Sequence, residues 1–169
     1  SNYPEYNILS FTENLGFSKR NNDGIRVAQG RYIALLNNDV ILERNWLNET
    51  VRTMETSKSI GVIGGSEYYA DQKHKLRFAG GRVIWWAGIC AQDNQKTNGI
   101  KDVDWIGGAA ILFRREGIDK IGLWDEGYYA FFEDVDFCVQ AKRAGFRVIY
   151  TPRAIVWHKG STSWSKNPR

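Results

Sequence analysis

Hydrophobic and polar positions in the first part of the chain form short apolar runs that alternate with amphipathic segments. The run Tyr32–Leu36 is uninterrupted, which is typical of a strand covered on both faces. Apolar positions in Asn45–Thr56 recur at helical spacing and predict an amphipathic helix. The elements expected here are, in order, a strand at Asn7–Phe11, a helix at Ser18–Gln29, the strand Tyr32–Leu36, the helix Asn45–Thr56 and a strand at Gly61–Gly64. This order predicts a mostly parallel sheet with helices packed on it.

Two signals set the ends of the first helix. Ser18 is of a type favoured at the N-cap, and Phe17 before it can act as the apolar residue of a hydrophobic staple. Gly30 supplies the glycine that commonly follows a helix C-terminus.

The pattern changes after Ser66, and no strong helical period is present before Asp104. Within this stretch, Arg82–Trp86 indicates an edge strand and Gln92–Lys101 an exposed loop. The elements predicted beyond it are a strand at Ile106–Phe113, helices at Arg114–Ile121 and Glu133–Ala144, a strand at Val148–Tyr150, an extended piece at Ala154–His158 and a polar tail or flap at Lys159–Arg169.

Length and composition fit one globular domain over residues 1–169. The net charge of +4 would suit nucleic acid, but the basic residues are scattered. A small anion such as a nucleotide diphosphate, or an anionic membrane surface, is equally compatible with that charge. Some of the seven Trp are expected to fill the core, and others to line a binding surface where they can stack on sugar rings.

The two cysteines, Cys90 and Cys138, are far apart and do not have metal-site spacing. They indicate structural thiols in a reduced, intracellular protein. No apolar run approaches the roughly 20 residues of a membrane span, and no signal peptide opens the sequence. We therefore expect a cytoplasmic location.

Asn37-Asn38-Asp39 follows the carboxyl end of a predicted buried strand, where open α/β sheets bind their ligands. Asp39 has two interpretations that the sequence leaves open. It is either a turn or helix-capping residue, or a carboxylate ligand for Mg²⁺ or Mn²⁺, which prefer oxygen donors.

Glu133-Asp134-Val135-Asp136 places three carboxylates in the first turn of a predicted helix. Acids there interact favourably with the helix dipole, which is a sufficient structural reason for them. The alternative is that one of them is a general base, and we expect the dipole to keep that base ionised at neutral pH.

His158 and the segment Gly107-Gly108-Ala109 each have two interpretations. His158 is either an ordinary surface histidine or a nitrogen ligand to the same metal as Asp39. The glycines serve either tight packing or a bulge, or they leave room for a sugar ring beside exposed backbone amides.

These segments occur in a recognisable order. The first group is Asn14-Leu15-Gly16-Phe17, Asn22, Gly24-Ile25, Ala28-Gln29-Gly30-Arg31-Tyr32 and Leu36-Asn37-Asn38-Asp39-Val40. The second group is Gly107-Gly108-Ala109-Ala110, Phe113-Arg114-Arg115-Glu116, Gly122-Leu123-Trp124-Asp125-Glu126, Glu133-Asp134-Val135-Asp136, Ala144-Gly145-Phe146-Arg147-Val148, Tyr150-Thr151-Pro152 and His158. The ordered set resembles the inverting family-two glycosyltransferases, in the branch that includes bacterial rhamnosyltransferases and related cell-surface polysaccharide enzymes.

The resemblance implies specific roles. Asp39 stands at the last carboxylate of the family's D-x-D motif and would hold the divalent metal, while Asn37 replaces the first Asp. His158 matches a late metal or diphosphate contact. Asp134 matches the catalytic base, with Glu133 as the second candidate. Donor and acceptor binding would fall to Asn14, Asn22, Asn37, Asn38, Trp105, Gly107, Gly108, Ala109 and Asp125.

The resemblance also implies a fold and partners. The fold would be GT-A-like and Rossmann-related, with a mostly parallel mixed sheet flanked by helices, and it would lack the family's opening nucleotide-binding unit. A nucleotide sugar would be the donor, and a saccharide or lipid-linked saccharide the acceptor. A sheet edge left open by the truncation would favour a homodimer or another assembly that covers the edge, and a peripheral membrane contact is a further expectation.

Two other functions compete with a glycosyltransferase. An inactive carbohydrate- or partner-binding remnant of the same fold would explain the absent opening unit. A nucleic-acid-binding domain would explain only the basic pI of about 9.1, and the acidic cluster at Glu133–Asp136 argues against it.

Overall fold

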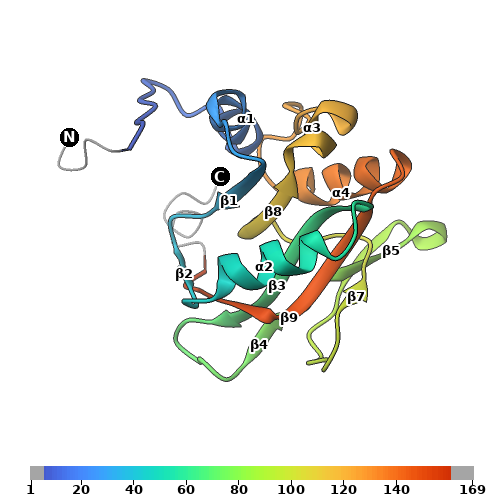
Figure 1. Ribbon diagram of the computed structural model, residues 1–169. Coiled ribbons are helices and arrows are strands. Elements are labelled where there is room, and N and C mark those ends of the chain that lie inside the picture. The colour runs from blue at the N-terminus through green and yellow to red at the C-terminus, as the bar shows by residue number, and fades with distance from the viewer. Residues whose placement is uncertain (1–5, 161–169) are drawn as a thin grey trace.

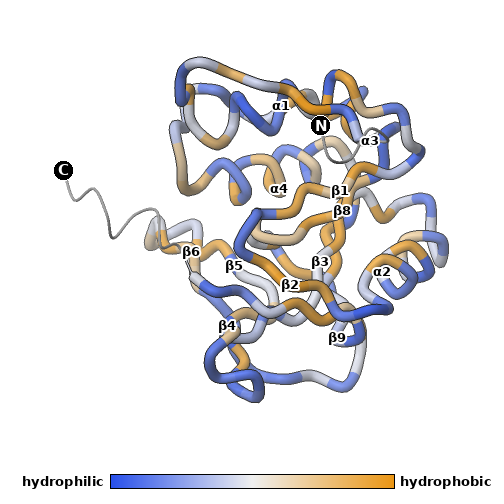
Figure 2. The backbone as a smooth tube through the Cα atoms, turned by 90° about the vertical axis from the view of Figure 1, so that its left-hand side faces the viewer, coloured by the Kyte–Doolittle hydropathy of each residue, from blue (hydrophilic) through white to orange (hydrophobic). Residues whose placement is uncertain are grey.

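The computed structural model describes residues 6–160 and folds them into three layers (Figure 1). Helix α2 (Trp46–Glu55) lies on one face of a mixed sheet. The other face carries α1 (Phe17–Val27), α3 (Arg115–Ile121) and α4 (Glu133–Arg143). The view in Figure 2 separates α2 from α4, with the largely hydrophobic strands of the sheet between them.

The main sheet has seven strands. Its path runs through β1 (Tyr32–Leu36), β8 (Ala110–Arg114), β3 (Ile60–Tyr69), β9 (Arg147–His158) and β2 (Val40–Leu42), with β4 (Leu76–Phe78) beside β3 and β7 (Lys101–Asp102) beside β9. A separate hairpin consists of β5 (Gly81–Ile84) and β6 (Ile89–Gln92), joined through the 3₁₀ turn η1 (Trp85–Ala87).

The α/β architecture and the mixed sheet are confirmed, but the expectation that most neighbouring strands are parallel is wrong. Only β3 and β9 pair in parallel, and every other described pair is antiparallel. The reason is that β8 lies between β1 and β3 and runs opposite to both. As a result β1, β3 and β9 point the same way, and their carboxyl ends lie at one edge of the sheet.

Two hydrophobic clusters hold the layers together. Val62, Phe113 and Phe137 belong to the cluster under α1, α3 and α4, and Phe113 and Phe137 have ring centroids 5.3 Å apart. Trp46 and Met54 anchor α2 to the opposite face, and both are essentially fully buried. The central strands are therefore packed on both faces. This packing holds in place the edge of the sheet at which the candidate site lies.

Three predictions near the N-terminus are wrong. Asn7–Phe11 forms no strand, because no described strand lies beside it to pair with, and its apolar side chains are exposed. The first helix begins after Gly16, which has φ 90° and packs against Tyr129, so Ser18 is a buried helical residue and not the N-cap. The helix ends at Val27, before the expected Gly30, since Ala28 is already extended.

Strand β1 has its predicted bounds but is not covered on both faces. Burial alternates along the strand, with Ile33 and Leu35 buried and Leu36 45% exposed, so only one face of β1 is covered. Helices α2, α3 and α4 match the predicted helices within one or two residues at each end. The strand expected at Ile106–Phe113 starts only at Ala110, since residues 106–109 turn along the candidate site.

The remaining differences concern the length of the strands and the number of short ones. β3 continues to Tyr69 and β9 joins the two extended pieces that were expected around Pro152. The expected strand Arg82–Trp86 stops at Ile84. Strands β2, β4, β6 and β7 were not predicted; each is only two to four residues long. The expected tail at Lys159–Arg169 lies outside the described residues beyond Gly160, and no helix in residues 6–160 is long and apolar enough to span a bilayer.

Candidate active site

A cavity of about 410 Å³ opens at the edge where β1, β3 and β9 end. Ligands of open α/β sheets bind at such carboxyl ends, and the lining includes Asn37, directly after β1, Glu67 in β3 and His158 in β9. The other lining residues are Phe17, Arg77, Phe78, Gln92, Trp105, Gly107, Gly108, Ala109, Ala130, Phe131, Glu133 and Asp134. Glu67, Glu133 and Asp134 supply three carboxylates, so we call this the acidic cavity.

Asp39, Glu67 and His158 form a continuous triad beside the acidic cavity. The imidazole Nε2 of His158 lies 3.1 Å from Oδ1 of Asp39, and its Nδ1 lies 2.6 Å from Oε1 of Glu67. All three side chains are at most one-fifth exposed. The hydrogen bond with Glu67 is the largest cause of a raised His158 pKa, and burial opposes it.

The contact between Asp39 and His158 is unfavourable unless a positive charge lies between the two side chains. When Nδ1 donates its proton to Glu67, a neutral His158 presents the lone pair of Nε2 to Asp39. Two electron-rich atoms then face each other at 3.1 Å, and Oδ1 of Asp39 is buried without a hydrogen-bond partner in the described part of the chain. A proton on Nε2 or a metal ion between the two atoms would remove this repulsion.

Arg77 on β4 brings a fixed positive charge to the acidic cavity. Its Nη1 lies 3.1 Å from Oε1 of Glu67 and 2.7 Å from Nδ1 of His158. Because Nδ1 cannot donate to Glu67 and accept from Arg77 at once, we assign the ion pair with Glu67 as the favourable contact of the guanidinium.

Asp134 lies in the first turn of α4 and is held by two backbone amides. The Gly108 N–H donates to Oδ2 at 2.8 Å, and the Val135 N–H donates to Oδ1 at 2.8 Å. We expected the helix dipole to keep this carboxylate readily ionised, but burial dominates and raises the pKa of Asp134, while the two backbone hydrogen bonds oppose the shift.

Glu133 is the more strongly buried of the two neighbours, at 6% exposure. Burial raises the pKa of its carboxyl to about 7, and the nearby Asp134 charge adds to the shift. Its Oε2 has no hydrogen-bond partner among residues 6–160. Burying a carboxyl oxygen without a hydrogen-bond partner costs free energy, and such groups are found mainly at functional sites.

Flat side chains and bare backbone shape the rest of the cavity. The rings of Trp105 and Phe78 contact each other in a tilted arrangement, with centroids 4.9 Å apart. A Cβ atom on Gly107 would meet nothing closer than 3.9 Å, whereas one on Gly108 would press on Trp124 at 3.3 Å and on Phe17 at 3.4 Å. Gly108 therefore lets the chain pass these rings while its amide points at Asp134.

The segment entering α4 has an unusual backbone. Phe131 and Phe132 have φ values of 70° and 69°, in the left-handed region that non-glycine residues rarely adopt. Phe132 is also the residue that caps α4. This conformation turns the chain sharply just before Glu133 and Asp134.

Four of the expected binding residues lie outside the acidic cavity. Asn14 accepts a hydrogen bond from the Gly16 N–H at 3.1 Å, Asp125 accepts one from the Gly127 N–H at 2.8 Å, and both are exposed turn residues. Asn38 is exposed in the turn between β1 and β2. Asn22 is fully buried, but in a different place.

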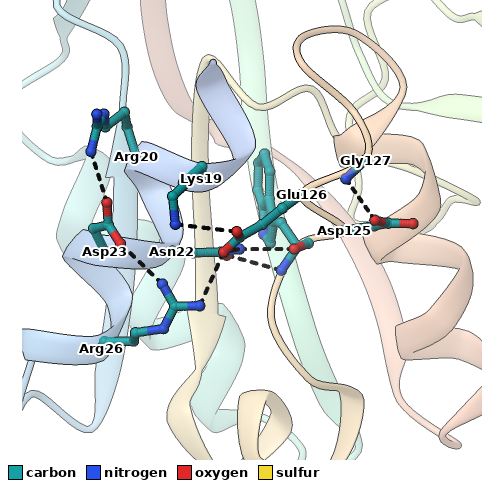
Figure 3. A network of polar contacts seen from close by, with 9 residues as sticks. Lys19, Arg20, Asn22, Asp23, Arg26, Asp125, Glu126 and Gly127 are labelled. Carbon is teal, nitrogen blue, oxygen red and sulfur yellow. Dashed lines mark hydrogen bonds and ion pairs between the residues drawn. The ribbon is translucent and has the colours of Figure 1, made fainter. Parts of the chain in front are cut away.

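Asn22 joins α1 to the segment after α3 (Figure 3). Its amide nitrogen donates to the Trp124 carbonyl at 2.8 Å and to Glu126 at 3.0 Å, and its oxygen accepts from the Trp124 N–H at 3.0 Å. Glu126 also pairs with Lys19 and Arg26. We call these five residues the α1 network, and its contacts give Asn22 a structural role.

Sequence reasoning missed several residues of the site. Glu67 is an acid near the carboxyl end of β3, so it obeys the rule that drew attention to Asp39. It was missed because β3 was expected to stop at Gly64. Arg77 and Phe78 come from the three-residue strand β4, which is too short to show a period. Nothing in the sequence singles out Gln92.

Comparison with known proteins gives a consistent result. The rhamnosyltransferase WbbL of Escherichia coli is 26% identical over 155 residues, covering 81% of this chain and 58% of its own. An N-acetylglucosaminyl-diphospho-decaprenol L-rhamnosyltransferase of Mycobacterium tuberculosis is 34% identical over 68 residues, covering 40% of this chain and 22% of its own. The chain spans less than two thirds of each of these relatives.

Among solved structures, GalNAc-T7 with UDP, GalNAc and Mn²⁺ superposes with a TM-score of 0.78 at 16% identity, over 96% of this chain and 34% of its own. This likeness shows that the fold is of the GT-A type. The sequence family described as glycosyltransferase-like family 2 matches residues 1–168. Because the match spans nearly the whole sequence, the chain belongs to glycosyltransferase family 2.

Proposed function

We propose that the acidic cavity transfers a sugar from a nucleotide-diphosphate donor to an acceptor hydroxyl with inversion at the anomeric carbon. The observation that supports this proposal best is the shared cavity. Asp134 and His158 line it together, and Asp39, which is not among the lining residues, contacts His158. A candidate base and a candidate metal-binding pair thus lie on either side of a space large enough for a sugar.

Asp134 is the proposed general base. Each of its oxygens accepts one backbone N–H and keeps a second lone pair, so the carboxylate is oriented but can still take a proton. Its raised pKa brings it closer to the operating pH, which suits a base. It would remove the proton of an acceptor hydroxyl as that oxygen attacks the anomeric carbon, so one displacement would complete the transfer. Glu133 is the second candidate.

Asp39 and His158 are the proposed holders of a divalent cation. One carboxylate and one imidazole fit Mn²⁺ better than Mg²⁺, because Mg²⁺ prefers all-oxygen donors. Residues 6–160 contain no group of three or more His, Cys, Asp or Glu side chains arranged for a metal, so donor phosphate oxygens and water would complete the sphere. When bound, the cation would offset the negative charge that grows on the leaving diphosphate.

The charge of the cavity supports this assignment. Three carboxylates line it, and Arg77 is the one lysine or arginine among its described lining residues. A diphosphate entering such a site would be repelled unless further positive charge came with it. Glu67 would act through His158: its hydrogen bond to Nδ1 fixes the ring and aims Nε2 at Asp39, a common arrangement behind metal-bound histidines.

The substrate class follows from the relatives and from the shape of the site. Two of them are rhamnosyltransferases by name, so we propose cell-surface polysaccharide synthesis, with a saccharide or lipid-linked saccharide as the acceptor. Trp105 and Phe78 line the acidic cavity and provide an apolar wall against which the C–H groups of a sugar could pack. Trp105, Asn37 and the Gly107–Ala109 segment keep their proposed donor- and acceptor-binding roles, and a location at the inner face of the membrane remains a prediction.

The decisive experiment is Asp134→Asn. Loss of the base should lower transfer about 10²–10⁴-fold, while Mn²⁺-dependent binding of the donor, measured by titration calorimetry, should stay within about twofold. Wild-type transfer should also fall as pH drops through the raised pKa of Asp134, because the base becomes protonated. Transfer by Asp134→Asn at the parent rate would refute the base assignment. Absence of donor binding by the parent would favour a carbohydrate- or partner-binding remnant.

A further inference from the structure

A second cavity has a volume of about 520 Å³. It is lined by residues of β3 and β9 that are direct sequence neighbours of residues lining the acidic cavity. In β3, Tyr68 lines it next to Glu67 of the acidic cavity; in β9, Trp157 lines it next to His158. Successive side chains of a strand point to opposite faces of the sheet. At these two positions the side chains that line the two cavities therefore point to opposite sides of β3 and β9.

The second cavity has an apolar floor and a basic rim. The floor consists of Tyr68, Leu76, Ile155 and Trp157, and the rim carries Lys73, His74, Asn94 and Lys96. None of these eight residues is a carboxylate, in contrast to the three that line the acidic cavity. We call it the basic cavity. Its volume falls within the range of small-molecule sites, and an apolar floor with a few polar groups is their usual composition.

Hydrogen bonds to the backbone connect the aromatic floor of the cavity with the turn that carries Lys73. The Trp157 indole N–H donates to the Lys73 carbonyl at 3.3 Å. At the base of the turn, the Tyr69 N–H donates to the Lys75 carbonyl at 3.2 Å and the Ala70 N–H donates to the His158 carbonyl at 3.0 Å. Lys73 thus belongs to a turn that is hydrogen-bonded to the end of β9. These bonds hold the lining of the cavity in a defined arrangement.

The two rim lysines retain their charge for a ligand. Within residues 6–160, neither Lys73 nor Lys96 forms an ion pair, whereas Lys101 on the same connection as Lys96 pairs with Asp93. A cation without a protein partner at the edge of an aromatic surface is suited to an anionic group of a ligand that packs on that surface.

We propose that the basic cavity binds an anionic saccharide, a sugar that carries a carboxylate or a phosphate. The faces of Tyr68 and Trp157 would pack against the sugar's C–H surface, and Lys73 and Lys96 would pair with its charge. Such a site, lined by residues adjacent to those of the proposed transfer site, would let the protein hold a charged glycan while a different hydroxyl reacts.

The test is titration calorimetry with three probes: a galacturonate tetrasaccharide, glucose 1-phosphate and the neutral glucose tetrasaccharide. We expect the galacturonate tetrasaccharide, the phosphate or both to bind, with affinity falling as salt rises, and the neutral probe to bind at least about tenfold more weakly. The double variant Lys73→Ala/Lys96→Ala should weaken binding about tenfold, since each exposed pair contributes modestly. Which charged probe binds distinguishes a carboxylate from a phosphate source.

The control is Lys58→Ala/Lys120→Ala, which removes the same charge from other elements, at the turn before β3 and in α3. It should leave binding unchanged. The assigned NMR signal of the Trp157 indole N–H should shift with the anionic probes. Binding by neither anionic probe, equal binding of the neutral probe, an equal loss in the control variant, or competition by UDP would each overturn the proposal. Because none of these variants touches the acidic cavity, failure here leaves the proposed transfer function standing.

Discussion

The α1 network and the Asp39–Glu67–His158 triad each contain a polar side chain with buried atoms, Asn22 and Asp39, and these two side chains differ in how completely they are hydrogen-bonded. In the α1 network, the Asn22 amide bonds both the N–H and the carbonyl of Trp124, and its hydrogen bond to Glu126 is the largest cause of lowering the pKa of that carboxyl to about 2. In the triad, Oδ1 of Asp39 is buried and lacks a hydrogen-bond partner within residues 6–160.

The difference separates structure from function. A buried side chain such as Asn22, whose amide nitrogen and oxygen both find protein partners, stabilises the fold and has nothing left for a ligand. Oδ1 of Asp39, opposite the Nε2 atom of His158, still has room for a proton or a cation between the two atoms. Asn22 was expected to bind the donor or acceptor and Asp39 the metal ion, and of the two only Asp39 has a buried oxygen without a hydrogen-bond partner within residues 6–160.

The largest effect that would test this comparison is on stability, from Asn22→Ala. The change strands the N–H and carbonyl of Trp124 in the interior, at about 1–3 kcal/mol for each group. We expect the free energy of unfolding to fall by about 2–4 kcal/mol in urea titration. Asn21→Ala is the matched control, since Asn21 is only partly buried and bonds within its own helix. Equal stability of Asn22→Ala and the parent would contradict a structural role for the α1 network.

The triad should show the opposite behaviour. Asp39→Ala should lower Mn²⁺ affinity in the presence of UDP by about 10–100-fold, while the unfolding free energy stays within about 0.5 kcal/mol or rises. Glu67→Gln should weaken binding less, because Glu67 orients the imidazole and does not touch the ion. Asp125→Ala, a turn residue outside the acidic cavity, serves as the control. Unchanged metal affinity in Asp39→Ala would remove the proposed metal site.

The smallest expected effect concerns Glu133, whose carboxyl is also orphaned. Its pKa is raised from 4.5 to about 7, so the folded state holds its proton more tightly than the unfolded state. Stability should therefore fall as pH rises from about 4.5 to about 7. Glu133→Gln should remove this dependence and add about 1–2 kcal/mol at pH 8 but nothing at pH 4, measured by thermal unfolding. A variant that is equally destabilised at both pH values would contradict the assigned burial effect.

The sequence predicted the central layers of the fold because periodicity is strongest where a segment faces the core. Helix α2 and strand β1 show this, since the bounds of each lie within one residue of those predicted. Elements that depend on a partner far away in sequence could not be predicted. The direction of β8 between β1 and β3 is one example, and the two-residue strand β7 is another.

The site was predicted in part, for a related reason. Asp39, Asp134 and His158 could be singled out because each is a functional residue type at the end of an element, and the structure brings them together. Glu67 and Arg77 could not, since their contribution arises from contacts with His158, 91 and 81 residues away. Whether residues 1–169 form one domain, and whether the edge of β1 pairs in a homodimer, stay predictions.

The left-handed backbone at Phe131 and Phe132 has a consequence for how the molecule loses its site. Each of these residues holds a conformation that costs roughly 1–2 kcal/mol relative to a right-handed one. The segment is therefore less stable locally than the helix it precedes, and it should open at a lower free energy than global unfolding. Opening would draw Asp134 away from the Gly108 amide, so heating should abolish the site while the sheet and its helices are still folded.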